Sequence, residues 1–250
     1  MKDKMEKLGK LKLSFLLVGA LVLVGCDDDD DDQVPFVSET FTVQIENVST
    51  NNLINTTRAN GTVPLSPGVY AVYDDDNPIF TVGQPANDGL ELIAEDGVTS
   101  QALSTLQSMS GILEGTFDAP GGPDNGPAIF AGETTTFTFE ASPGDRLQIA
   151  TMFVQSNDWF YAFGDNGLDL FDGLNAIEGD VTSELVLYDA GTEADTAPGT
   201  GPDQKPAQDP AAVDVGPDDS VNQVQIAATR HTTFTIPATS SVIRVTITHD

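Results

Sequence analysis

The sequence predicts an all-β fold, an antiparallel β-sandwich with long acidic loops and little helix. Short segments alternate apolar and polar residues with a period of two, as half-buried strands do. Turns rich in Gly, Pro, Asn and Asp separate these segments. Apolar residues at helical spacing occur only in two short stretches, 89–95 and 101–113. Many short strands joined by such turns are typical of a sandwich.

Seven segments between residue 41 and the C-terminal region have the alternation or the β-branched and aromatic content of strands. In chain order they are 41–46, 69–73, 134–140, 146–154, 184–188, 223–226 and 241–248. The turn Ser142-Pro143-Gly144-Asp145 joins the third to the fourth, so these two strands are predicted to form a hairpin. Residues 118–127 and 190–219 are predicted to be long loops. The second has about 30 residues, a length found in functional or disordered segments.

The N-terminal 25 residues have the pattern of a signal peptide. Five lysines precede an apolar stretch, 13–25, that is too short to cross a bilayer, which takes about 20 residues. Cys26, the only cysteine, follows Leu-Val-Gly, and this segment resembles the lipobox of bacterial lipoproteins. The resemblance implies cleavage before Cys26, attachment of lipid to it, and a membrane-anchored protein of the cell envelope, on the periplasmic side or the cell surface. The alternative is an ordinary secretory signal with a chance cysteine.

Three regions follow from this interpretation. Residues 1–25 are the signal peptide, 26–38 are the lipidated cysteine with a disordered tether, and 39–250 are the folded domain. The tether contains six consecutive aspartates, Asp27–Asp32, and a block of like charges is typically solvated.

The remaining chain, 26–250, has 37 acidic residues and five lysines and arginines. Such a surface repels nucleic acid and anionic lipid, so no nucleic-acid partner is expected. It attracts cations or basic partners. The acidity is equally explained as a solubility adaptation to a salty habitat.

Signals for catalysis are weak. The sequence has no Gly-rich phosphate loop before a helix and no EF-hand spacing. His231 and His249, the only histidines, have no triad-like context. We therefore do not expect an enzyme, although a hydrolase acting on an envelope polymer through an unrecognised carboxylate pair remains an alternative.

Three motifs stand out, in chain order. They are Ala-Asn-Asp-Gly-Leu with Ala-Glu-Asp-Gly at 86–97, Ser-Asn-Asp-Trp-Phe at 156–160, and Asp-Ala-Gly-Thr-Glu at 189–193. Together they resemble the spondin domain, the module of the F-spondins, over roughly residue 41 to the C-terminus. The resemblance implies a β-sandwich with a calcium ion at one end. It assigns the calcium ligands to Asp158, Asp189 and Glu193.

Calcium binds about six to eight oxygen ligands, which carboxylates and carbonyls supply. Gly191 allows the turn that would bring Asp189 and Glu193 to one point. This sequence departs from the family at Glu193, where Asp is usual, at Asn157, where Pro is usual, and in lacking the cysteines of animal members. Trp159 is expected in the core rather than in a ligand site.

The resemblance implies a binding or adhesion module anchored in the membrane through Cys26, with an envelope or extracellular protein or a glycan as its ligand. The alternatives are the hydrolase described above and a passive acidic envelope component that binds no specific metal.

Overall fold

The computed structural model describes residues 38–120 and 128–250. The predicted signal peptide, Cys26 and nearly all of the tether lie outside the described residues, as does most of the predicted loop 118–127. Within the chain, Phe36–Asp250 forms one compact unit. Among the described residues, no helix combines the length and apolar character needed to cross a membrane.

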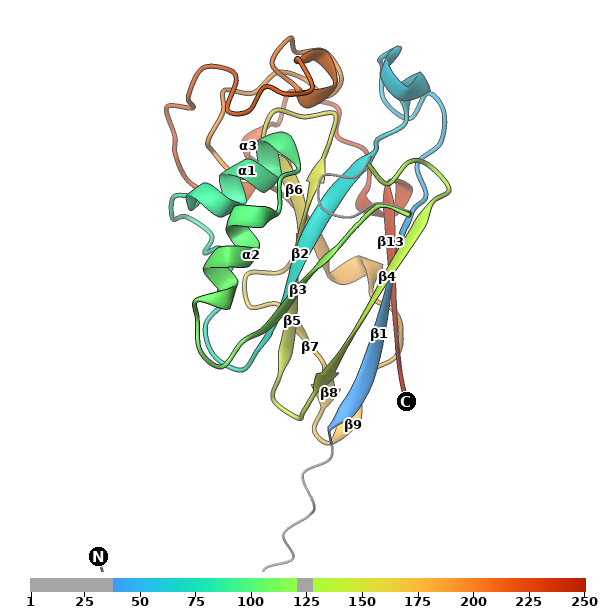
Figure 1. Ribbon diagram of the computed structural model, residues 1–250. Helices are drawn as coiled ribbons and strands as arrows, with labels where there is room; N and C mark the ends of the chain where they lie inside the picture. Colours follow the sequence, from blue (N-terminus) through green and yellow to red (C-terminus); the bar gives the residue numbers. More distant parts are fainter. Residues whose placement is uncertain (1–37, 121–127) are drawn as a thin grey trace, which may run out of the picture. The chain divides into compact units, whose positions relative to one another are not determined.

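The described residues form two main antiparallel sheets, which confirms the predicted all-β sandwich (Figure 1). The first sheet has the order β10-β13-β1-β4, with β10 at Gly179–Asp180, β13 at Ile243–His249, β1 at Glu39–Asn47 and β4 at Thr134–Ala141. The second has the order β12-β11-β6-β5-β2-β3, with β12 at Gln225–Ile226, β11 at Leu185–Asp189, β6 at Trp159–Phe163, β5 at Arg146–Phe153, β2 at Leu65–Tyr73 and β3 at Leu113–Phe117.

Smaller elements complete the fold. The strand β7, Leu168–Asp169, pairs with β5, and β8, Phe171–Asp172, pairs with β9, Asn175–Ala176. Within residues 38–120 and 128–250 the α-helices are α1, Asp88–Asp96, α2, Ser100–Gln107, and α3, Ala227–Arg230. Short 3-10 segments lie at Arg58–Gly61, Thr182–Glu184, Lys205–Ala207 and Thr239–Ser241. The first contains left-handed dihedral angles at Ala59 and Asn60.

The predicted hairpin between 134–140 and 146–154 is wrong. Both segments are strands, but β4 pairs with β1 in the first sheet, and β5 pairs with β2 and β6 in the second. The turn at 142–145 therefore carries the chain from one sheet to the other. The burial of the two strands explains the difference. β4 alternates buried and more exposed residues at a sheet edge, whereas β5 is buried on both faces and suits a central position.

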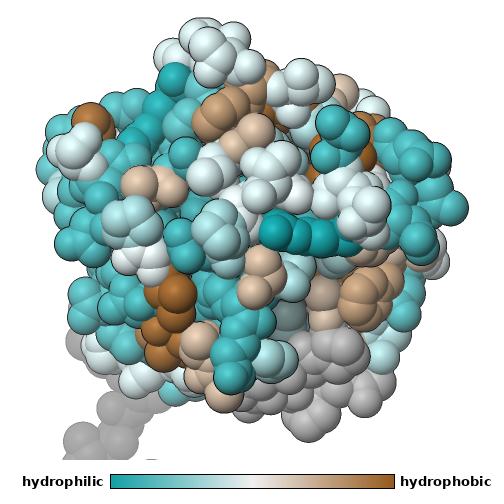
Figure 2. Space-filling model, turned by 90° about the horizontal axis from the view of Figure 1, so that it is seen from above, coloured by the Kyte–Doolittle hydropathy of each residue, from teal (hydrophilic) through white to brown (hydrophobic). Residues whose placement is uncertain are grey.

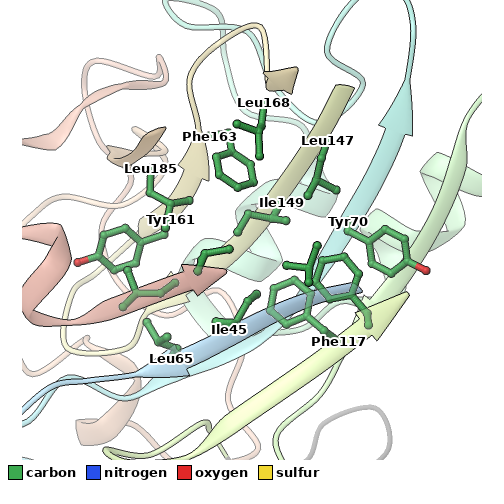
Figure 3. Packing of buried hydrophobic residues seen from close by; sticks show 14 of the residues in the cluster. Ile45, Leu65, Tyr70, Phe117, Leu147, Ile149, Tyr161, Phe163, Leu168 and Leu185 are labelled. Carbon is green, nitrogen blue, oxygen red and sulfur yellow. The ribbon is translucent and has the colours of Figure 1, made fainter. Parts of the chain in front are cut away.

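The main core lies between the two sheets. Ile45 of β1 shares this core with Ile149 and Leu147 of β5, and Tyr161 and Phe163 of β6 extend the same layer (Figure 3). Strict alternation in β1 buries Phe41, Val43 and Ile45 completely, as the sequence pattern predicts.

A second core lies between the outer face of the second sheet and the helices. α1 packs on β5 and β6, and α2 packs on β2 and β3 (Figure 1). Leu90 and Ile93 of α1 are buried there in one cluster with Ala150 of β5 and Phe160 of β6. The Asn87 side chain caps α1 by accepting hydrogen bonds from the N–H groups of residues 89 and 90. This layer explains why all nine residues of β2 are buried.

Candidate metal centre

Two of the predicted calcium ligands meet at one end of the second sheet. Asp158 directly precedes β6 and Asp189 ends β11. The antiparallel register pairs Trp159 with Asp189, and the N–H of Ala190 donates to the backbone oxygen of Asp158 over 3.1 Å. Strand pairing therefore places the two acidic residues side by side. Both are fully buried.

Asp158 has one satisfied and one unsatisfied carboxylate oxygen. Its Oδ2 accepts hydrogen bonds from the backbone N–H groups of Thr192, at 2.7 Å, and Glu193, at 3.1 Å. Its Oδ1 is buried and has no hydrogen-bond partner among the described residues. Burial, followed by the charges of Asp189 and Asp195, raises the pKa of Asp158 well above its usual value, against the effect of the backbone donors.

Asp189 is fully engaged by donors. Its Oδ1 accepts from the N–H of Gly191, at 2.7 Å, and from Nη1 of Arg230, at 3.0 Å. Its Oδ2 lies 2.5 Å from Nε2 of His231. Gly191 has a φ of 72°, and a Cβ there would lie 2.5 Å from the backbone oxygen of Gln223. A glycine is therefore needed both for the turn and for the close approach of residues 221–223.

The third predicted ligand, Glu193, belongs to a different set of contacts. Its side chain is buried, and its Oε1 accepts a hydrogen bond from Nδ2 of Asn157 over 3.0 Å. Burial raises the pKa of Glu193 to about 8, with Asn157 opposing and Glu95 the first of the charges that add to it. The structure thus brings Asp158 and Asp189 together, while Glu193 touches this centre through its backbone N–H.

Two residues that the motifs did not indicate complete the centre. Asp195 and His231 each place a ligand-type atom within 4.8 Å of Asp189 and of one another. The imidazole of His231 stacks against the rings of Trp159 and Phe234, with centroid distances of 5.2 and 4.9 Å. Its Nε2 lies 3.0 Å from Oδ2 of Asp195.

The charges around His231 set its protonation. Burial opposes the charged form, but hydrogen bonds and the charges of Asp189 and Asp195 outweigh it and raise the pKa of His231 to about 9. Burial, with Asp189 adding to it, raises the pKa of Asp195 to about 6. A charged imidazolium is therefore held in contact with two buried carboxyls near neutral pH.

Sequence reasoning could have found these residues from two signals. Asp195 follows Asp189 by six residues and Glu193 by two, so it continues the acidic pattern of this segment. Arg230 is one of only five lysines and arginines in 26–250, and it directly precedes His231. In a chain with so few basic residues, the adjacent Arg230 and His231 are expected to pair with acidic side chains of the same chain. Trp159, predicted in the core, is fully buried.

Negative charge exceeds positive charge in this centre. The centre contains four acidic residues, Asp158, Asp189, Asp195 and Asp219, and two basic residues, Arg230 and His231. Arg230 pairs with both Asp189 and Asp219. The buried, unpartnered Oδ1 of Asp158 and the hard oxygen donors around it fit a divalent cation such as calcium. Figure 2 views the domain from above, the end where 190–219 lies, and its surface there is mostly hydrophilic.

The comparisons with known proteins identify no family for this chain. No family model matches this chain, and no curated protein sequence matches it. The resemblance to the spondin domain rests on the three motifs.

Proposed function

We propose that this chain is a lipid-anchored protein of the cell envelope whose β-sandwich binds calcium and acts by binding a ligand rather than by catalysis. The calcium site we propose consists of Asp158, Asp189 and Asp195, with Glu193 holding Asp158 through its backbone N–H. The observation that carries this proposal is the Oδ1 atom of Asp158, which is buried and unpartnered among the described residues.

Electrostatics supports a cation at this place. Three buried carboxylates that converge without sufficient positive charge repel one another, and burial increases the cost because the low dielectric strengthens the repulsion. Calcium replaces that repulsion with attraction and accepts carboxylate oxygens in flexible geometry. It would also fix the 189–195 segment, because Asp158 already holds that segment through the N–H groups of Thr192 and Glu193.

Calorimetry tests the calcium site. Calcium is titrated into the purified chain in 0.5 M KCl, a salt chosen because it screens weak binding by exposed acids. Asp189→Asn is expected to lose a saturable site that the wild type has. Asp172→Asn, which removes an exposed acid on β8, is expected to keep it. Asp195→Asn provides a second variant if Asp189→Asn unfolds. Equal stoichiometry in wild type, Asp189→Asn and Asp195→Asn would refute the site.

The anchoring part of the proposal is supported by the lipobox-like segment that ends in Cys26. The expected ligand is an envelope or extracellular protein or a glycan, by analogy with the spondin family. Cys26→Ser is expected to move the protein from the membrane fraction to the soluble fraction and to abolish incorporation of a labelled fatty acid. Retention of both properties in Cys26→Ser would contradict the anchor.

A second candidate function follows from Arg230 and His231. Both basic side chains contact Asp189, so ion pairs supply part of the positive charge that calcium would supply. In that case the chain is a passive acidic envelope component without a specific metal. It predicts that millimolar calcium changes the melting temperature no more than an equal ionic strength of KCl.

A further inference from the structure

A second group of acidic side chains lies where the long loop meets α1. Glu91 and Glu95 are one turn apart on α1, so both point to the same side of the helix. Asp214, from the long loop, joins them, and the three residues place carboxylate oxygens within 4.8 Å of one another. Glu95 is only 3% exposed, so this group is not simply a solvated acidic surface.

The backbone holds Asp214 against the two glutamates. The N–H of Asp214 donates to Oδ2 of Asp96 over 3.0 Å. The other oxygen of Asp96 pairs with Nζ of Lys205 at 2.9 Å, and that ammonium also donates to the backbone oxygen of Ala212. Lys205 is thus engaged by Asp96. Within the part of the chain that the structure describes, the charges that act on Glu91 and Glu95 are all negative.

Glu193 supplies an independent indication of a missing ligand. It is 3% exposed, and its Oε2 is buried with no partner among the described residues. Its carboxylate lies against Gly216, where a Cβ would come within 1.9 Å of Oε1, and Glu95 is the first charge that acts on it. Gly216 follows Asp214 by two positions, so this unsatisfied carboxylate packs against the same loop that brings Asp214 to the two glutamates.

Thr192 links the group to the first centre. Its hydroxyl contacts Oδ2 of Asp158 at 3.3 Å and also hydrogen-bonds Glu95. One hydroxyl has a single proton to donate, so it cannot satisfy both carboxylates at once. A cavity of about 350 Å³, lined in part by Glu91, Thr192, Asp214 and Asp218, opens beside them and gives an ion and its waters access.

We propose that Glu91, Glu95 and Asp214 form a second calcium site, with the buried carboxylate of Glu193 packed against Gly216 of the loop that carries Asp214. Three carboxylates supply hard oxygen ligands, and water in the adjoining cavity completes the six to eight that calcium takes. Thr192 then contacts an acid of each site, Asp158 of the first and Glu95 of the second. Calcium at this second site removes the repulsion among α1, the long loop and residue 193.

Calorimetric titration of calcium into the full chain in 0.5 M KCl tests the second site. The proteins compared are the wild type, Asp214→Asn, Asp189→Asn, the double variant and Asp88→Asn. Asn tolerates the left-handed backbone of residue 214, which has a φ of 52°, so Asp214→Asn is expected to fold. Asp88→Asn removes an exposed acid from the same helix and serves as the matched control. Thermal melting in EDTA verifies that each variant is folded.

The wild type and Asp88→Asn are expected to bind two calcium ions per chain. Asp214→Asn and Asp189→Asn are each expected to bind one, and the double variant none. Unchanged stoichiometry in Asp214→Asn would overturn the second site. A wild type with one site that is lost in Asp214→Asn and kept in Asp189→Asn would support the second site and refute the first. The reverse pattern would refute the second site alone.

Discussion

Gly191→Ala is the substitution whose effect follows most directly from the geometry. Residue 191 follows the end of β11 by two positions, and its φ of 72° lies in the left-handed region. An alanine Cβ would lie 2.5 Å from the backbone oxygen of Gln223, 2.6 Å from its nitrogen, and 2.8 Å from the backbone oxygen of Val221. All three are backbone atoms, so no side chain can rotate away. The segment 221–223 must move.

Two costs add in this variant. The left-handed conformation costs an L-residue other than glycine about 1–2 kcal/mol. Forced backbone displacement in a packed region costs about 1–3 kcal/mol more. We therefore expect Gly191→Ala to lower the free energy of unfolding by about 2–5 kcal/mol. The assay is urea denaturation followed by circular dichroism, in EDTA so that metal binding does not contribute.

Gly173→Ala separates the two costs. Residue 173 has a φ of 63°, and a Cβ there would have no neighbouring atom within 4 Å among the described residues. This control should therefore show the conformational cost alone, about 1–2 kcal/mol. Equal destabilisation by the two substitutions would refute the argument that the turn at 191 is fixed by contact with 221–223.

Two further predictions concern the buried acids and the loop. Because burial raises the pKa of Glu193 to about 8 and that of Glu95 to about 7, folding favours their protonated forms. Their contribution to stability is complete below about pH 4.5 and is lost as the pH rises through 7 and 8, so the melting temperature in EDTA should fall from pH 5 to pH 8.5. Glu193→Gln should flatten that fall, and an identical slope in the variant would contradict the assignment. Asn157→Ala removes the side-chain oxygen that accepts hydrogen bonds from the N–H and the hydroxyl of Thr196. The free energy of unfolding should therefore fall by about 2–4 kcal/mol, and proteolysis within 190–219 should become faster. Asn175→Ala, at an exposed hairpin, should change stability by less than about 1 kcal/mol, and similar proteolysis of both variants would contradict the role of Asn157.

Local patterns predicted strands better than they predicted pairing. The alternation at 41–46 and 134–140 correctly indicated β1 and β4, because one face of each is buried. The same reasoning wrongly paired β4 with β5, because a four-residue turn does not reveal whether the chain stays in one sheet. β3, Leu113–Phe117, was not predicted as a strand. Its residues are mostly half-buried, and its glycine interrupts the pattern.

The candidate site was predictable only where strand pairing determined it. Asp158 and Asp189 flank strands that pair, so their proximity follows from motifs at strand ends. The direction of Glu193 depends on Asn157, 36 residues away in sequence, and the position of His231 depends on stacking against Trp159 and Phe234. Such contacts between distant segments leave no periodic signal in the sequence.

Anomalous diffraction from a crystal grown with calcium tests the central claim most directly. We predict a calcium peak with Oδ1 of Asp158 at about 2.3–2.6 Å, the usual calcium–oxygen distance, and with Asp189 or Asp195 among the other ligands. Arg230 or His231 should then have moved away from Asp189. Crystals with saturating calcium, no anomalous peak beside Asp158, and both basic side chains still in contact with Asp189 would contradict the claim.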